Sequence, residues 1–181
     1  MAKILLLILA TIAAALAWQH ESHHRISQRA IPGTVSSDLS TISKDLGALT
    51  ATLDAYTGGI VDGLTVMKSE RVLIRDLDSS TSHADNLSDL SEPDARDLLK
   101  SINELVPDVE GTLHAIANKE PEIRAAGMHK QAVSHVKKLE GMVEKYGNAL
   151  VKPMPEEEKS QGKDVLARIM EVFVKTLAQL Q

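Results

Sequence analysis

The sequence predicts an all-α protein, an up-and-down bundle of about five amphipathic helices. Apolar residues recur at alternating intervals of three and four along several long segments, which is the period of one face of a helix. No segment of useful length alternates as a β-strand does. Aromatic residues make up only 2% of the 181 residues, so the core must consist of aliphatic residues and methionine.

Residues 1–17 are predicted to be a secretory signal peptide. Lys3 supplies the positive start, residues 4–16 are almost entirely apolar, and Ala15-Leu16-Ala17 is a small-x-small cleavage site. The apolar run is too short to span a bilayer as a stable anchor. We therefore expect a secreted, extracellular protein that begins at Trp18. It contains no cysteine, so it must be stable without disulfides.

Residues 18–33 are polar and rich in histidine, and they end in Pro32-Gly33, which predicts a flexible leader. Cleavage after Ala17 would leave Trp18-Gln19-His20 at the new terminus. There the amine, two backbone amides and the His20 imidazole could form a square-planar Cu(II) site. The alternative is a leader that is rich in histidine without any role in metal binding. No other cofactor is predicted.

The remaining residues, 34–181, are predicted to form one helical domain. Its first helix begins after an N-cap at Thr34 and ends at Gly58-Gly59. The apolar stripe of this helix comprises Val35, Leu39, Ile42, Leu46, Leu49, Leu53 and Tyr56. A second helix follows, in which polar residues 68–71 interrupt a stripe of Ile60, Leu64, Met67, Leu73, Leu77, Ala84 and Leu87.

Ser91-Glu92-Pro93-Asp94 has the pattern of a capping box and predicts the start of a third helix. Pro107 lies inside it, and proline disfavours a helix interior by about 3 kcal/mol. The apolar phase nevertheless continues across Pro107, in Ala95, Leu98, Ile102, Leu105, Val109, Leu113 and Ile116. We therefore predict a helix kinked at Pro107, or two coaxial segments, and no reversal of the chain.

A short helical segment is expected at residues 122–126, between Pro121 and Gly127. The next helix carries Met128, Ala132, Val136, Leu139, Val143, Tyr146 and Leu150 on one face. Residues 152–162 contain two prolines and three consecutive glutamates, which predicts an exposed loop. The last helix carries Leu166, Ile169, Phe173, Leu177 and Leu180, and its charged Glu171 and Lys175 argue against a carboxy-terminal membrane anchor.

Composition and motifs exclude several classes of function. The formal charge is −5, which argues against nucleic acid as a partner. No histidine stands in a nucleophile or zinc-protease pattern, so we do not expect an enzyme. Secreted helical enzyme inhibitors of this size normally depend on disulfides, which this chain lacks. Asn86-Leu87-Ser88 is a glycosylation acceptor pattern, and Asn86 is predicted to be accessible.

Four segments together resemble the fungal hydrophobic surface-binding protein A family, which includes cell-wall galactomannoproteins. Residues 42–59 resemble its opening helix, and Leu105-Val106-Pro107-Asp108-Val109 resembles a later segment. Residues 119–127 and the last amphipathic helix through Phe173 also fit, although Ile123 stands where the family often has phenylalanine. The resemblance covers nearly all of residues 34–181.

The resemblance implies a secreted or wall-associated helical domain that adsorbs to hydrophobic surfaces and helps to recruit secreted esterases. It also implies that fatty acids or similar amphiphiles bind between the helices. The candidate cavity-lining residues are Leu46, Leu49, Leu53, Leu73, Leu77, Val109, Leu113, Ile116, Val136, Leu139, Val143, Ile169, Phe173 and Leu177. The same apolar stripes could instead form only a core, because spacing does not distinguish the two.

Two functional hypotheses therefore stand side by side. The first is a lipid-binding module with an interior site, and the second is a surfactant-like wall protein without a defined pocket. Family members on the cell wall often carry Ser/Thr-rich linkers and a lipid anchor signal, and this chain has neither. We therefore expect a monomeric, soluble protein, associated with the wall non-covalently if at all.

Overall fold

The computed structural model describes residues 33–181, and every regular element in that range is helical. The helices are α2 (Gly33–Asp54), α3 (Ile60–Asp85), α4 (Glu92–Asn118), α5 (Glu120–Ala125), α6 (His129–Val151) and α7 (Glu156–Gln179). The five long helices and the short α5 confirm the predicted fold class. The predicted signal peptide and the leader with the His20 copper site lie outside the described residues, except for Gly33.

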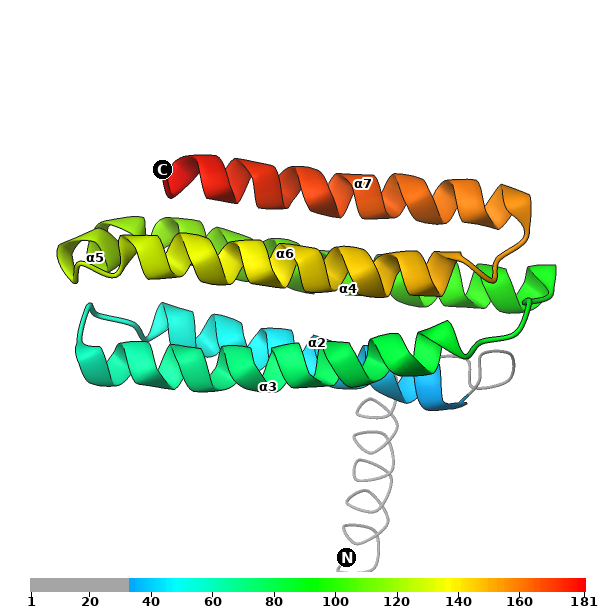
Figure 1. The fold of residues 1–181 in the computed structure, drawn as a ribbon, viewed down its shortest axis with the longest axis horizontal. Helices are drawn as coiled ribbons and strands as arrows, with labels where there is room; N and C mark the ends of the chain where they lie inside the picture. The colour runs from blue at the N-terminus through cyan, green and yellow to red at the C-terminus, as the bar shows by residue number, and fades with distance from the viewer. Residues whose placement is uncertain (1–32) are drawn as a thin grey trace, which may run out of the picture.

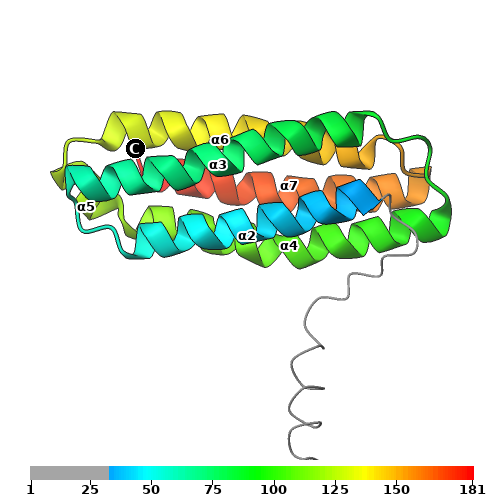
Figure 2. The ribbon, with the colours of Figure 1, turned by 90° about the horizontal axis from the view of Figure 1, so that it is seen from below.

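Each long helix runs antiparallel to the long helix before it, as an up-and-down bundle requires (Figure 1). The five form a closed ring: α2 packs on α3 and α4, α7 packs on α4 and α6, and α3 packs on α6. Seen from below, α2 and α3 are nearest the viewer and α7 lies behind them (Figure 2). The α2–α3 turn and α5 are at one end of the bundle, and the loops before α4 and α7 are at the other.

The ring encloses one continuous aliphatic core. The predicted stripe of α2 is buried along its whole length, and Leu73, Leu98 and Phe173 are completely inaccessible. Each such side chain contributes roughly 1.5–3 kcal/mol of burial free energy. Polar contacts also fix α2 against α4: Ser43 Oγ donates to Asp108 Oδ2 at 2.5 Å, and the hydroxyls of Thr50 and Thr112 lie 2.9 Å apart.

Two helix starts and one helix interior can be compared with the sequence. Thr34 is inside α2, which already includes Gly33, so its assignment as the N-cap was wrong. Ser91 is the N-cap of α4 as predicted, and its Oγ accepts the backbone N–H of Asp94 at 3.4 Å. The helix passes through Pro107 without a break, which confirms that the chain does not reverse there. The kink itself remains a prediction.

The segment expected to be an exposed loop is largely helical. α7 begins at Glu156, and Met154, Glu158 and Gly162 are all buried. The three consecutive glutamates occupy the first turn of α7, where negative charge interacts favourably with the helix dipole. Only residues 152–155 connect α6 and α7, and α7 begins about two turns earlier than predicted.

Within residues 33–181, none of the helices combines the length and the apolarity that crossing a membrane would require.

Candidate ligand-binding site

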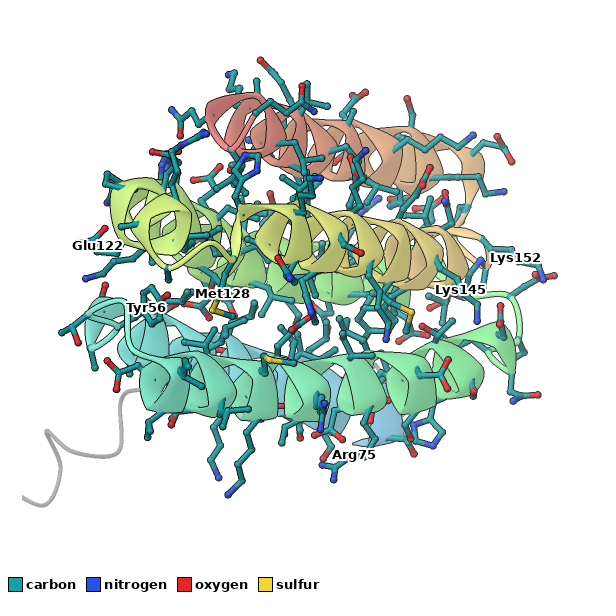
Figure 3. The ribbon with its side chains drawn as sticks, turned by 60° about the vertical axis from the view of Figure 1, so that its left-hand side comes forward. Tyr56, Arg75, Glu122, Met128, Lys145 and Lys152 are labelled. Carbon is teal, nitrogen blue, oxygen red and sulfur yellow. The ribbon has the colours of Figure 1, made fainter. Side chains whose placement is uncertain are left out.

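A cavity of about 130 Å³ lies inside the end of the bundle where α2 turns into α3. We call it the end cavity. Figure 3 shows two labelled residues of its wall, Tyr56 and Met128, meeting across the space between the α2–α3 turn and the start of α6. The wall consists of Leu49, Leu53, Tyr56, Gly63, Val66, Met67, Glu70, Ile116, Ile123, Met128, Gln131, Ala132, His135, Val136 and Leu139.

Two glycines allow the chain to close this end of the bundle. Gly58, with φ of 97°, ends the turn after Tyr56, and Gly127, with φ of 68°, turns the chain from α5 into α6. Positive φ is readily accessible only to residues without a Cβ. Thr57 then positions α3, because its N–H and its hydroxyl both donate to Asp62 Oδ2, at 3.2 and 2.7 Å.

A third glycine lets a methionine reach the cavity wall. A Cβ at Gly63 would lie only 3.2 Å from the Met128 methyl and 3.3 Å from its sulfur. The Tyr56 hydroxyl donates to the same sulfur at 3.9 Å. Burial, with the nearby Asp62 and Glu122 carboxylates, raises the pKa of Tyr56. The contact between the neutral Tyr56 side chain and Met128 therefore joins the α2–α3 turn to the residue that precedes α6.

The end cavity has one ionisable pair in its wall. Glu70 of α3 is only 6% exposed, and its two carboxylate oxygens lie 2.7 and 2.6 Å from Nδ1 of His135 in α6. His135 is 39% exposed, so the pair connects the cavity with the surface between α3 and α6. Gln131, one turn before His135 on α6, adds a side-chain amide to the wall of the end cavity.

A second cavity of about 50 Å³, which we call the inner cavity, follows the end cavity along the bundle. On α2 the wall passes from Leu49 to Leu46, and on α3 it passes from Glu70 to Leu73. The inner cavity is lined by Leu39, Ile42, Leu46, Leu73, Leu77, Ile102, Leu105, Val109, Val143, Tyr146, Gly147, Leu150, Val151, Gly162, Leu166 and Ile169. The two cavities are thus in series.

The inner cavity contains one unpaired polar group. The Tyr146 hydroxyl is buried and makes no hydrogen bond within residues 33–181. Burial is the main cause that raises the pKa of Tyr146, and the Asp38 carboxylate adds to it. A neutral hydroxyl is therefore held inside an otherwise aliphatic space.

These volumes are small for a lipid. Pockets for small ligands measure roughly 300–1,000 Å³, and a cavity of about 150 Å³ holds a molecule the size of benzene. An acyl chain can therefore occupy the end cavity only in part unless core side chains move apart. Met67 and Met128 suit such movement, because their unbranched side chains adopt many rotamers.

The structure divides the fourteen predicted cavity residues into three groups. The end cavity contains Leu49, Leu53, Ile116, Val136 and Leu139. The inner cavity contains Leu46, Leu73, Leu77, Val109, Val143 and Ile169. The other three line neither space, and they are Leu113, Phe173 and Leu177, all buried in the surrounding core.

The polar part of the site was not predicted from the sequence. Glu70 lies within the polar run, residues 68–71, that interrupts the apolar stripe of the second helix, and no histidine of this helical domain was predicted to have a role. The position of His135 could have been predicted, because it is one turn from both Ala132 and Leu139 and so shares with them the face of α6 that lines the cavity. The interhelical contact with Glu70 depends on the tertiary structure and leaves no sequence signal of its own.

The predicted glycosylation site does not belong to this cavity. Asn86 is exposed at the carboxyl end of α3, where its side-chain amide donates to the Ser82 carbonyl at 2.6 Å. Its glycosylation remains a prediction. Over residues 33–181, no group of three or more histidine, aspartate or glutamate side chains is arranged to hold a metal ion.

An exposed apolar cluster adjoins the end cavity. Ile60, Val61 and Leu64, in the first turns of α3, are 81%, 74% and 60% exposed. Gly63, Val66 and Met67 of the same helix face inward to the cavity wall. The apolar surface therefore extends from the interior of the bundle to its outer tip at this end.

The family model described as hydrophobic surface binding protein A matches residues 32–152. Among solved structures, AFMP4P in complex with palmitic acid is 28% identical, with a TM-score of 0.79 over 82% of this chain and 98% of the other. Two domains of Penicillium marneffei MP1 protein share the fold. Ligand binding domain 1, complexed with arachidonic acids, is 14% identical, with a TM-score of 0.76 over 82% of this chain and 97% of that domain.

Ligand binding domain 2, complexed with multiple arachidonic acids, is 16% identical, with a TM-score of 0.76 over 88% of this chain and 98% of that domain. No curated protein sequence matches the chain.

Proposed function

The chain belongs to the hydrophobic surface binding protein A family, and we propose that it is a non-enzymatic carrier of fatty acids or similar single-chain amphiphiles, bound inside the helical bundle. The acyl chain would enter between α3 and α6, occupy the end cavity, and extend toward the inner cavity. The observation that supports this proposal best is the series of two almost wholly aliphatic cavities along the bundle axis.

The physical driving force is sufficient for such a ligand. Each buried methylene contributes about 0.8 kcal/mol, whereas association costs on the order of 4–15 kcal/mol in lost freedom and ordering. A long acyl chain can therefore bind with useful affinity only if most of its length is buried. The two cavities must then join into one space, which requires side chains between them to change rotamer.

Native mass spectrometry tests this proposal. The purified protein would be measured as isolated, after delipidation, and after addition of palmitic or arachidonic acid, the acids found with its structural relatives. We expect added mass that returns at a fixed stoichiometry of one or two acids per chain. A protein that stays free of ligand after fatty-acid addition would contradict an interior site.

A second candidate function is adsorption to hydrophobic surfaces without a defined pocket. The exposed cluster of Ile60, Val61 and Leu64 favours it, because contiguous exposed apolar residues mark interaction sites. Adsorption to polystyrene beads would then scale with bead area, and replacement of the three residues by serine should reduce it. The same variant should retain its fatty-acid stoichiometry if the two activities are separate.

We also propose that the protein is secreted, is non-covalently associated with a fungal cell wall, and assists secreted esterases at hydrophobic substrates. The predicted signal peptide and the family membership support this proposal. Culture medium from an expressing fungus should contain a chain that begins at Trp18, and salt or detergent should release any wall-bound portion. Retention of the protein within the cells would contradict secretion.

A further inference from the structure

We propose that the Glu70–His135 pair makes the end cavity selective for amphiphiles whose head group donates a hydrogen bond, a hydroxyl or an ammonium, over carboxylate anions. This inference rests on the proposed function, because it assumes that an acyl chain occupies the end cavity.

The position of the pair identifies it as the place for a head group. Glu70 and His135 belong to α3 and α6, the two helices between which the cavity approaches the surface. The side chain of His135 is 39% exposed and that of Glu70 only 8%. Glu70 and His135 therefore lie between the aliphatic cavity wall and the solvent. They would contact the head group of a ligand whose acyl chain lies among Leu49, Ile116 and Leu139.

The two side-chain oxygens of Glu70 share one partner. A carboxylate offers roughly four acceptor positions and no donor hydrogen. Among residues 33–181 its one hydrogen-bonding partner is His135, whose Nδ1 is shared by both oxygens at 2.7 and 2.6 Å. Nδ1 donates to Glu70 when this side chain is a carboxylate, because a carboxylate can only accept. Glu70 lines a largely apolar cavity, where an acceptor position without a donor costs free energy.

A donating head group would complete this site. A hydroxyl supplies one hydrogen to Glu70, and an ammonium supplies up to three together with a compensating charge. A carboxylate anion supplies none, and it would bring a second negative charge into a region of low dielectric. A fatty acid could occupy the same place in its protonated form, which carries a donor hydrogen. The pair therefore discriminates by head group and leaves the chain unrestricted.

Chain-matched ligands test the inference. Native mass spectrometry and displacement of a fluorescent acyl probe would compare dodecanol, dodecylamine and dodecanoate at about pH 8, where the last is ionised. We expect dodecanol and dodecylamine to bind the wild-type protein more tightly than dodecanoate, on the order of tenfold, the effect of one charge-assisted hydrogen bond. Comparing the alcohol with the amine shows whether a hydroxyl is sufficient or a positive charge is needed.

Substitution of Glu70 should remove this preference. Glu70→Gln keeps the shape of the side chain and an acceptor for His135, but it removes the charge. It should bring the three affinities to within about threefold of one another. The matched control is Glu158→Gln, a buried glutamate of α7 that pairs with Arg96 at 3.1 Å and lies outside the end cavity. The control should bind all three ligands as the wild type does.

A second variant covers the case in which Glu70→Gln does not fold. His135→Ala removes the donor partner of Glu70 at a partly exposed position, so the preference for dodecylamine over dodecanoate should increase. Equal binding of the three ligands by the wild type, or an unchanged preference in Glu70→Gln, would overturn the inference while leaving the lipid carrier intact. Failure of every ligand to bind would instead overturn the proposed function.

Discussion

Gly162 of α7 lies against Val151 at the end of α6, so close that a Cβ added to the glycine would be 2.7 Å from Cγ2 of the valine. Gly147 of α6 makes the corresponding approach to Leu166 of α7, with a hypothetical Cβ 2.7 Å from Cδ1. The two glycines thus set the distance between the last two helices. Both of them also line the inner cavity.

Gly162→Ala should therefore destabilise the bundle. The added methyl group would force Val151 or α7 to shift, and overpacking of this kind costs about 1–3 kcal/mol, more than the gain in helix propensity. Chemical denaturation would measure the free energy of unfolding. The matched control is Gly141→Ala, a helical glycine of α6 with open space around its Cβ position, which should stabilise by about 0.5–1 kcal/mol. A stabilised Gly162→Ala variant would show that the two helices can separate freely.

The contact between α2 and α3 should depend on pH. Asp45 of α2 faces Asp76 of α3, and Asp76 is held as a carboxylate by Arg75, whose Nε lies 2.7 Å from Oδ1. Burial and the hydrogen bond and charge of Asp76 raise the pKa of Asp45 from 3.8 to about 6, against the smaller opposing effects of Arg75 and Lys44. The two carboxyl groups can share a hydrogen bond only while one is protonated.

The sign of the effect follows from this raised pKa. The folded state binds the proton on Asp45 more tightly than the unfolded state does. Protonated Asp45 therefore contributes fully to the free energy of unfolding below pH 3.8, and this contribution is lost as pH rises through about 6. Asp45→Asn should melt at a higher temperature than the wild type at neutral pH and should show a weaker pH dependence over this window. The control Asp89→Asn, in the exposed loop before α4, should follow the wild type. Parallel melting curves for Asp45→Asn and the wild type at every pH would contradict this account.

The unpaired hydroxyl of Tyr146 should reduce the stability of the protein in the absence of ligand. Tyr146→Phe removes a buried group that has no partner within residues 33–181, and we expect stabilisation of about 1 kcal/mol. Tyr56→Phe is the matched comparison, because the Tyr56 hydroxyl donates to the sulfur of Met128. Thermal melting should show a gain for the first variant and none for the second. Destabilisation by Tyr146→Phe would indicate that the hydroxyl is hydrogen-bonded to water in the inner cavity.

Filling the end cavity should separate ligand binding from folding. Ala132 lines the cavity on α6, and Ala132→Phe would place an aromatic ring in a space of about 130 Å³. We expect the variant to fold with unchanged helicity but to lose most of its fatty-acid binding in native mass spectrometry. Ala167→Phe, at an exposed position of α7, is the control and should bind normally. Undiminished binding by Ala132→Phe would place the ligand elsewhere in the bundle.

Much of the fold could be predicted from local patterns. The stripe of α2, the N-cap at Ser91 and the passage of α4 through Pro107 all follow from helical periodicity and capping chemistry, which act over a few neighbouring residues. The misinterpreted segment was 152–162, where prolines and glutamates suggested a loop. Glutamates are equally suited to the first turn of a helix, and only the burial of Glu158 and Gly162 against neighbouring helices decided between the two.

The sequence by itself determined the helices, their order and the aliphatic character of the core, because helical periodicity depends only on residues three and four positions apart. The tertiary structure decided which buried residues line a cavity: Leu139 does, whereas Leu113 and Phe173, with the same pattern, do not. It also decided that Glu70 and His135, far apart in the chain, form one pair in the cavity wall. Cavities and interhelical pairs arise from the relative placement of helices, on which the pattern within a single helix carries no information.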